Sequence, residues 1–245
     1  MIIKRIFNAC IFYRMQKKNI KKEISPTMNN GNLFEKKYYS QDGEDAVLMS
    51  FYEDRTEYKG FYIDIGALHP LRFSNTQLFY EKGWRGINID ATPGSMLEFN
   101  ELRPEDINIE AGIFDHGEEL TFFRFKEPAL NSFNKEISDE RIVKGWELLE
   151  KIKIKTLSIN EILDKNLLNG IRIDFINIDV EGLDFEILRS LDWKKYDPKF
   201  LLIEALDIVD KNIVGYEKTE MYKFINGLGY SIVARTRRTL IFKKY

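Results

Sequence analysis

Acidic side chains follow four of the strand-like runs of this chain. Asp64 and Asp90 come at the ends of the first and second runs, and Asp179 and Glu204 come at the ends of the fourth and fifth. In an open parallel sheet, ligands bind in the crevice outside the carboxyl ends of the strands. Helix capping explains one or two such acids, but it explains four less well. The pattern therefore predicts one acidic ligand site at a single edge of a sheet.

The first two acids have the spacing of a nucleoside-binding site. Asp90 follows Asp64 by 26 residues, where a carboxylate accepts both hydroxyls of a ribose. Gly66 permits close approach of the backbone at the first turn. The residues after it, 67–70 (ALHP), lack the further glycines that cradle a pyrophosphate. The pattern favours S-adenosylmethionine, which carries no phosphate, over NAD.

Three residues are candidates for proton transfer at such a site. His69 lies three residues after Gly66, near the predicted donor, and shaping the turn before Pro70 is an equally good role for it. Asp179 and Glu181 follow the fourth strand, where they would face the acceptor, and helix capping is the alternative for Asp179. Alignment of the reactants supplies about 7–11 kcal/mol of such a transfer. A general base adds a factor of about 10²–10⁴, so positioning should dominate.

Two further pairs of residues are candidates for ligand contacts. Asp179 and Glu204 are candidate ligands of a divalent metal, Mg²⁺ or Mn²⁺, which would orient an acceptor hydroxyl and lower its pKa. Ser74 and Asn75 lie where the amino-acid end of the donor would be held, although capping of the next helix also explains Ser74.

The elements that must position these residues alternate between strand-like and helical patterns, which is typical of an α/β fold with a mostly parallel sheet. A capping box, Ser158 with Glu161, begins one helix, and another is predicted over 219–228. Residues 126–155 are polar and resemble an insertion, with a helix predicted at about 138–150. Strands are predicted at 61–65, 86–89, 107–111, 120–125, 175–178 and 200–203, and a C-terminal antiparallel hairpin at 230–234 and 239–242.

Four runs, in this order, resemble the motifs of FkbM-type methyltransferases. They are 39–45 (YSQDGED), 61–76 (FYIDIGALHPLRFSNT), 83–96 (GWRGINIDATPGSM) and 175–188 (FINIDVEGLDFEIL). The resemblance covers roughly residues 38–242. It implies a Rossmann-like class I methyltransferase fold, S-adenosylmethionine as donor, and O-methylation in glycan or secondary-metabolite pathways. It also implies that the turns after the first two strands hold the donor, through Asp64, Gly66, Ala67, Asp90 and Ala91.

Composition and charge limit the other possibilities. A net charge of −2 gives the chain no polycationic character, so no nucleic-acid partner is expected. The single cysteine, Cys10, permits no intrachain disulfide and fits a cytoplasmic protein. Residues 1–37 carry nine Lys/Arg against two acids. Weak contact with an anionic membrane is one interpretation of this segment, and a solvated helix followed by a linker is the favoured one.

The sequence as a whole predicts a basic N-terminal segment, 1–37, and one methyltransferase domain, 38–245. The predicted activity is S-adenosylmethionine-dependent O-methylation of a sugar hydroxyl. The sugar would be nucleotide-linked or part of a surface polysaccharide pathway. An NAD-dependent oxidoreductase and a non-catalytic Rossmann-like scaffold are the alternatives.

Overall fold

The computed structural model describes residues 36–245 except 55–56, 115–116, 169 and 206–212. The chain divides into two compact units, Met1–Lys37 and Tyr38–Tyr245, and the second unit contains all the elements given below. The basic segment lies almost wholly outside the described residues, so its membrane contact stays a prediction. Among the helices of the described ranges, none is long and apolar enough to cross a bilayer.

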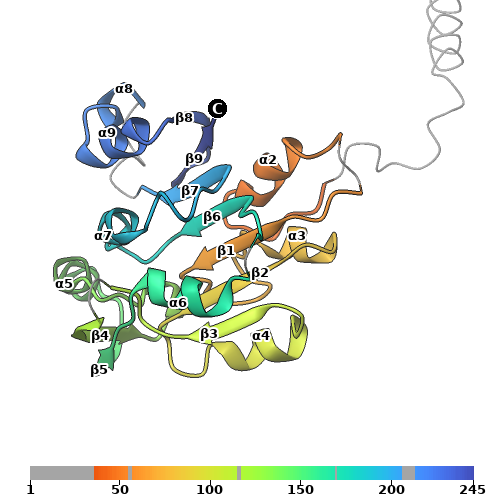
Figure 1. Ribbon diagram of the computed structural model, residues 1–245. Helices are drawn as coiled ribbons and strands as arrows, with labels where there is room; N and C mark the ends of the chain where they lie inside the picture. Colours follow the sequence, from red (N-terminus) through yellow and green to blue (C-terminus); the bar gives the residue numbers. More distant parts are fainter. Residues whose placement is uncertain (1–35, 55–56, 115–116, 169, 206–212) are drawn as a thin grey trace, which may run out of the picture. The chain divides into compact units, whose positions relative to one another are not determined.

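A seven-stranded sheet of order β3-β2-β1-β6-β7-β9-β8 forms the centre of the second unit (Figure 1). The parallel strands are β1 (Phe61–Ile65), β2 (Arg85–Asp90), β3 (Ile107–Glu110), β6 (Phe175–Ile178) and β7 (Phe200–Glu204). The antiparallel pair β8 (Tyr230–Arg235) and β9 (Thr239–Lys244) extends the sheet from β7. This topology confirms the predicted α/β, Rossmann-like fold with a C-terminal antiparallel hairpin. The strand order reverses between β1 and β6, which is where such sheets bind ligands.

Alternate residues of each strand pack against different helices. Tyr62 of β1 faces α2 (Glu44–Ser50) and α3 (Gln77–Glu81), with Leu48 and Phe79 in the same cluster. Ile63 faces the opposite layer, formed by α6 (Ile159–Asn166), α7 (Asp184–Ser190) and α9 (Glu220–Gly227). The second unit also contains α4 (Met96–Leu102) and α8 (Ile213–Tyr216). Both faces of the sheet are therefore covered, as a parallel sheet requires.

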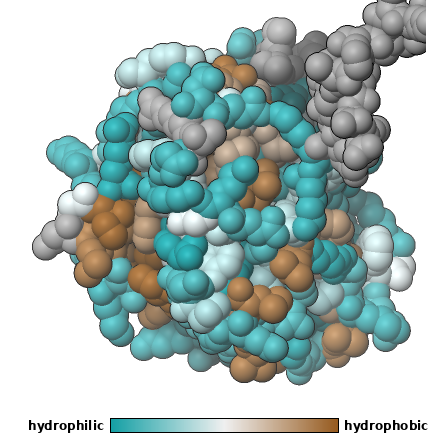
Figure 2. Space-filling model, turned by 90° about the vertical axis from the view of Figure 1, so that its right-hand side faces the viewer, coloured by the Kyte–Doolittle hydropathy of each residue, from teal (hydrophilic) through white to brown (hydrophobic). Residues whose placement is uncertain are grey.

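The surface and one helix start follow the sequence closely. On the face shown in Figure 2, hydrophilic residues cover most of the surface and hydrophobic residues form separate patches.

The Ser158 hydroxyl accepts from the Asn160 N–H at 3.3 Å, and the Glu161 carboxylate accepts from the Ser158 N–H at 3.4 Å. The predicted capping box at the start of α6 is confirmed.

Residues 119–155 form a small subdomain of the second unit, beside the main sheet. It contains β4 (Glu119–Phe125), the 3₁₀ helix η2 (Pro128–Leu130), α5 (Lys135–Val143) and β5 (Leu148–Lys155), and β4 pairs antiparallel with β5. The helix predicted at about 138–150 is wrong beyond residue 143. Gly145, at φ +90°, ends the helical turn, and half-buried Ile152 and Ile154 then alternate with exposed lysines at the period of a strand.

Candidate active site

A cavity lies at the carboxyl ends of β1, β2, β6 and β7, the edge at which the sequence predicts a site. Its walls include Gly66 after β1, Asp90 at the end of β2, Asp179 after β6 and Glu204 at the end of β7. Three of the four predicted strand-end acids therefore surround one space. Segments 41–44 and 128–133 contribute further wall residues.

Asp64, the fourth of these acids, does not line the cavity. It lies inside β1, followed by Ile65, and its side chain is 2% exposed on the face that carries Tyr62. Its carboxylate accepts from the Thr76 hydroxyl at 2.9 Å and from the Asn177 amide at 2.8 Å. Alternation along the strand directs Asp64 into a buried polar layer rather than toward a ligand. The structure thus places it as a support of the site's first strand.

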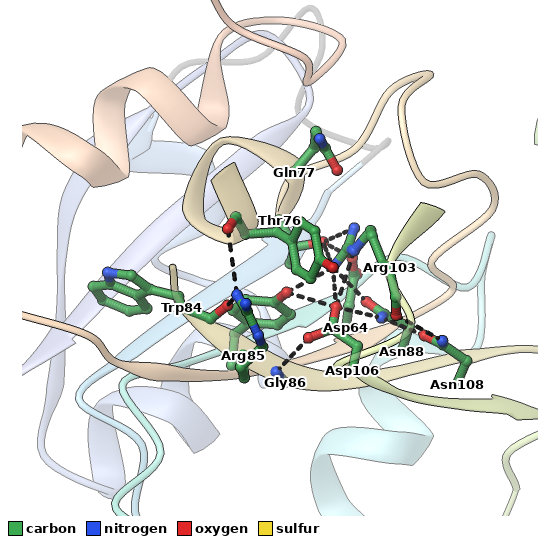
Figure 3. A network of polar contacts seen from close by, with 12 residues as sticks. Asp64, Thr76, Gln77, Trp84, Arg85, Gly86, Asn88, Arg103, Asp106 and Asn108 are labelled. Carbon is green, nitrogen blue, oxygen red and sulfur yellow. Dashed lines mark hydrogen bonds and ion pairs between the residues drawn. The ribbon is translucent and has the colours of Figure 1, made fainter. Parts of the chain in front are cut away.

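That polar layer is organised by Arg103, whose side chain is fully buried (Figure 3). Its Nε donates to Asp106 at 2.9 Å, and its Nη2 donates to the Tyr62 hydroxyl at 2.7 Å and to Asn88 at 3.0 Å. Nη1 and Nη2 both reach the Thr76 hydroxyl at 3.0 Å. The sequence did not single out Arg103 or Asp106, because both follow the last turn of α4 with no motif around them. We call Tyr62, Asp64, Thr76, Asn88, Arg103 and Asp106 the Arg103 network.

Asp90 has the geometry expected of a ribose acceptor. Its carboxylate accepts from the backbone N–H groups of Leu68 at 3.0 Å and Thr92 at 2.7 Å. Burial raises the pKa of Asp90, and these two bonds oppose the rise. A carboxylate has about four lone-pair directions, so Asp90 can also accept from hydroxyl groups, and in the protein alone the Thr92 and Ser95 side chains lie within its reach. Ala91 also lines the cavity, whereas Ala67 packs against the apolar side of α4 instead.

Gly66 is required by the approach of two backbone segments. Its φ is +85°, and a Cβ there would lie 1.7 Å from the carbonyl oxygen of Asp179. The sequence predicts a close backbone approach at Gly66. In the structure, the loop after β6 makes that approach. Any side chain at this position would separate two walls of the cavity.

His69 takes the turn-shaping role rather than the catalytic one. Its Nδ1 accepts from the backbone N–H groups of Leu71 and Arg72, both at 3.0 Å. Its Nε2 lies 2.7 Å from a carboxylate oxygen of Glu98. Both ring nitrogens are therefore engaged, and His69 is not among the residues that line the cavity. The ring holds the 69–72 turn in shape.

Ser74 and Asn75, the other candidates near the donor, are separated by the fold. The Ser74 hydroxyl is buried and accepts from the N–H of Gln77, the first residue of α3, at 3.1 Å, although the N-cap residue of this helix is Thr76 and not Ser74. Asn75 does line the cavity, and its amide donates to Asn177 at 3.0 Å. Because Asn177 in turn donates to Asp64, these amides connect the cavity wall to the Arg103 network.

The opposite wall carries three carboxylates, which we call the acid cluster: Asp179, Glu181 and Glu204. One oxygen of each lies within 4.8 Å of the others. Burial raises the pKa of Asp179 well above its usual range, and repulsion from Glu181 adds to the rise. Burial and repulsion from Asp179 do the same to the pKa of Glu204. Glu204 is 7% exposed, and its Oε2 has no hydrogen-bond partner among the described residues.

The loop that presents the acid cluster is held from two sides. Asp184 accepts from the N–H groups of Val180 and Gly182, both at 3.1 Å, and burial raises its pKa to about 7. Arg141 of α5 forms an ion pair with Glu181, which opposes the rise in that acid's pKa. Nothing in the spacing of 126–155 marks Arg141 in the sequence. Only the packing of α5 against this loop brings it to Glu181.

The chain's distant segments close the cavity. Asp42 and Glu44, from before and within α2, lie on its wall with Arg238 from the β8–β9 turn. Arg238 donates to Asp42 at 2.9 Å, and the Thr236 hydroxyl donates to Glu44 at 2.5 Å. The described wall thus holds one arginine against six acids: Asp42, Glu44, Asp90, Asp179, Glu181 and Glu204. Such a field attracts a cationic ligand and repels a phosphate.

Comparison with known proteins gives one family match. A family model described as the methyltransferase FkbM domain matches residues 64–232. Among solved structures, fibrillarin of Aeropyrum pernix with natively bound S-adenosyl-L-methionine is 12% identical, covers 81% of this chain and 71% of its own, and has a TM-score of 0.42. The plantazolicin methyltransferase BpumL with S-adenosylhomocysteine (SAH) is 10% identical, covers 75% and 54%, and has a TM-score of 0.32. These likenesses carry no argument about the acceptor. No curated protein matches the chain.

Proposed function

The chain belongs to the FkbM family of S-adenosylmethionine-dependent methyltransferases, and we propose that its acceptor is a hydroxyl group of a sugar. The observation that carries this proposal is the cavity itself. One of its walls offers the carboxylate of Asp90, and the facing wall offers the acid cluster. A donor and a polyhydroxyl acceptor therefore have separate partners within one space.

The donor wall fits S-adenosylmethionine on three counts. Asp90 is available to both hydroxyls of the ribose. The turn after Gly66 has no glycine-rich cradle for a pyrophosphate, which disfavours NAD. The surplus of acids on the wall suits a positively charged ligand. When bound, S-adenosylmethionine supplies a methyl group already activated by its positive sulfur.

The acid cluster fits the acceptor's side of the reaction. Asp179 and Glu204 have raised pKa values, and a carboxylate with a raised pKa is a stronger base than an exposed one. Asp179 would take the proton that the acceptor hydroxyl loses when its oxygen is methylated. Arg141 holds Glu181 in place beside it, where the carboxylate accepts a second hydroxyl of the sugar. Positioning by these contacts is the larger contribution.

The sugar we expect carries no phosphate close to the reacting hydroxyl. Phosphate beside the acid cluster would meet repulsion, and Arg238 is already paired with Asp42. A nucleotide-linked sugar remains compatible with the cavity only if its diphosphate lies outside these walls. Precursors of a surface polysaccharide, in a cytoplasmic location, are the acceptors we propose first.

Mass spectrometry of reactions with S-adenosylmethionine tests the proposal. Free sugars, glycan fragments and nucleotide-sugars are each incubated with the protein, and a mass gain of one methyl on a sugar hydroxyl is expected. Asp179→Asn serves as the inactive control. Methylation of a non-carbohydrate panel alone would contradict the sugar assignment. Calorimetric binding of NAD in place of S-adenosylmethionine would favour the oxidoreductase alternative.

A further inference from the structure

The proposed function leaves two features of the acid cluster unexplained. Three carboxylates lie together, and one oxygen of Glu204 has no hydrogen-bond partner among the described residues. We propose that Asp179, Glu181 and Glu204 bind one hard divalent cation, Mg²⁺ or Mn²⁺, at the acceptor end of the cavity. Binding of the ion does not depend on the proposed function. Its role with a sugar acceptor, described below, rests on that function.

The geometry of the cluster matches a shared ion. Oxygen ligands lie about 2.0–2.6 Å from such cations, so two ligands on one ion are separated by at most about 5 Å. The three carboxylate oxygens lie within 4.8 Å of one another. They come from the loop after β6 and from the end of β7, two neighbouring parallel strands, so the sheet itself sets their separation.

The unpartnered oxygen of Glu204 is an independent sign of a ligand. Glu204 is 7% exposed, and its Oε2 meets no donor in the described part of the chain. Buried polar atoms are nearly always paired, because an unpaired one costs free energy that an apolar group would not. A cation between Glu204 and Asp179 supplies the missing partner.

The protein's own cations do not fill this place. Arg141 pairs with Glu181 and with the carbonyl of Leu130, and Arg238 pairs with Asp42. Within the described ranges, no ion pair reaches Asp179 or Glu204. The donor set is all oxygen, with neither histidine nor cysteine, which suits Mg²⁺, Mn²⁺ or Ca²⁺ rather than Zn²⁺.

An ion at this place would complete the acceptor site. Protein carboxylates rarely fill the whole coordination shell of Mg²⁺, so positions are left for water or for two neighbouring hydroxyls of a sugar. A hydroxyl bound there is oriented and more readily deprotonated. The alternative explanation of the cluster is a proton shared between Asp179 and Glu204, which needs no ion.

Direct binding of Mn²⁺ alone separates the two explanations. The protein is treated with EDTA and desalted, and Mn²⁺ is titrated without donor or acceptor, with the free ion followed by electron paramagnetic resonance. We expect one equivalent to bind, and Glu204→Gln and Glu181→Gln each to weaken binding at least about tenfold. Glu186→Gln, at an exposed acid of α7, is the matched control and should bind as the wild type does.

Each result bears on the proposal. Absence of Mn²⁺ binding to the folded wild-type protein, or equal affinity in Glu204→Gln and Glu181→Gln, would overturn the ion site. Circular dichroism of each variant checks folding, and the two variants provide separate tests. Methylation of a sugar at full rate in EDTA would overturn the ion's role with the acceptor and keep the proposed function. Mn²⁺ binding with no methylation of any sugar would keep the site and overturn the proposed acceptor.

Discussion

The protein has two acidic regions, one buried and one partly buried, that differ in how their charges are balanced. In the Arg103 network, Asp106 accepts from Arg103, from the Tyr62 hydroxyl at 2.7 Å and from the Asn88 amide at 3.0 Å (Figure 3). In the acid cluster, carboxylates face one another, and one oxygen of Glu204 has no described partner. Burial alone therefore does not identify a functional acid. The state of its hydrogen bonds does.

The Arg103 network is joined to the cavity wall through the side chain of Asn177. Asn177 of β6 accepts from Asn75 on the cavity wall and donates to Asp64 of the Arg103 network. A saturated network of this kind favours one arrangement of its side chains, since any rotation would leave a buried group unpaired. The network thus acts as the rigid base on which the strand ends of the cavity are held.

The largest expected effect is on stability, from the Arg103 network. Arg103→Met leaves Asp106 buried without its cation, which should lower the free energy of unfolding by about 3–5 kcal/mol. Denaturant unfolding measures this. Arg85→Met, which removes a partly exposed arginine paired with Glu105 at 3.2 Å, is the control and should cost at most about 1 kcal/mol. Equal losses of unfolding free energy in the two variants would show that the Arg103 network stabilises the protein no more than a partly exposed ion pair does.

The second effect is on turnover, from the acid cluster. Asp179→Asn removes the proposed base and should lower kcat by at least about 10². Its unfolding free energy should stay equal to that of the wild type or rise, because a charge is removed from a group of like charges. Steady-state kinetics and denaturant unfolding of one preparation measure both. A kcat near that of the wild type would clear Asp179 of the proton transfer.

A smaller effect is expected on donor binding, from the opposite wall. Asp90→Ala removes the acceptor of the ribose hydroxyls and should weaken S-adenosylmethionine binding by about 10–100-fold, the value of one or two charge-assisted hydrogen bonds. Calorimetry measures this. Asp64→Asn is the informative comparison, since its carboxylate does not line the cavity. If Asp64→Asn weakened binding more than Asp90→Ala, the assignment of the two acids would be reversed.

The smallest effect is a pH dependence of the same binding. The ionised form of Asp90 accepts the ribose hydroxyls, so bound donor favours that form, and affinity falls as the pH drops through the pKa of Asp90. Burial raises this pKa, so the loss should begin at a higher pH than for an exposed aspartate. Calorimetry from about pH 8 to about pH 5 covers the range. The same slope in Asp90→Asn would assign the effect to another group.

Local patterns were sufficient for most of the secondary structure. The strands at 61–65, 175–178 and 200–203 and the capping box at Ser158 follow from hydrophobic runs and from a four-residue signal. The helix predicted near 138–150 was wrong beyond residue 143, because a polar stretch has weak periodicity and pairing with β4 decides the structure of 148–155. Asp64 was misplaced for a different reason: it lies inside the strand 61–65, and alternation along the strand directs its side chain to the face that carries Tyr62.

Sequence alone determined the fold class, the family resemblance and the positions of Asp90, Asp179, Glu181 and Glu204 near one sheet edge, because strand ends and motifs are local features. The tertiary structure decided which of these acids are saturated by the chain and which face the cavity. It also brought Asp42 and Arg238 to the walls and Arg141 to Glu181, from segments far apart in the sequence. Hydrogen-bond saturation depends on contacts between such segments, and no spacing along the chain encodes it.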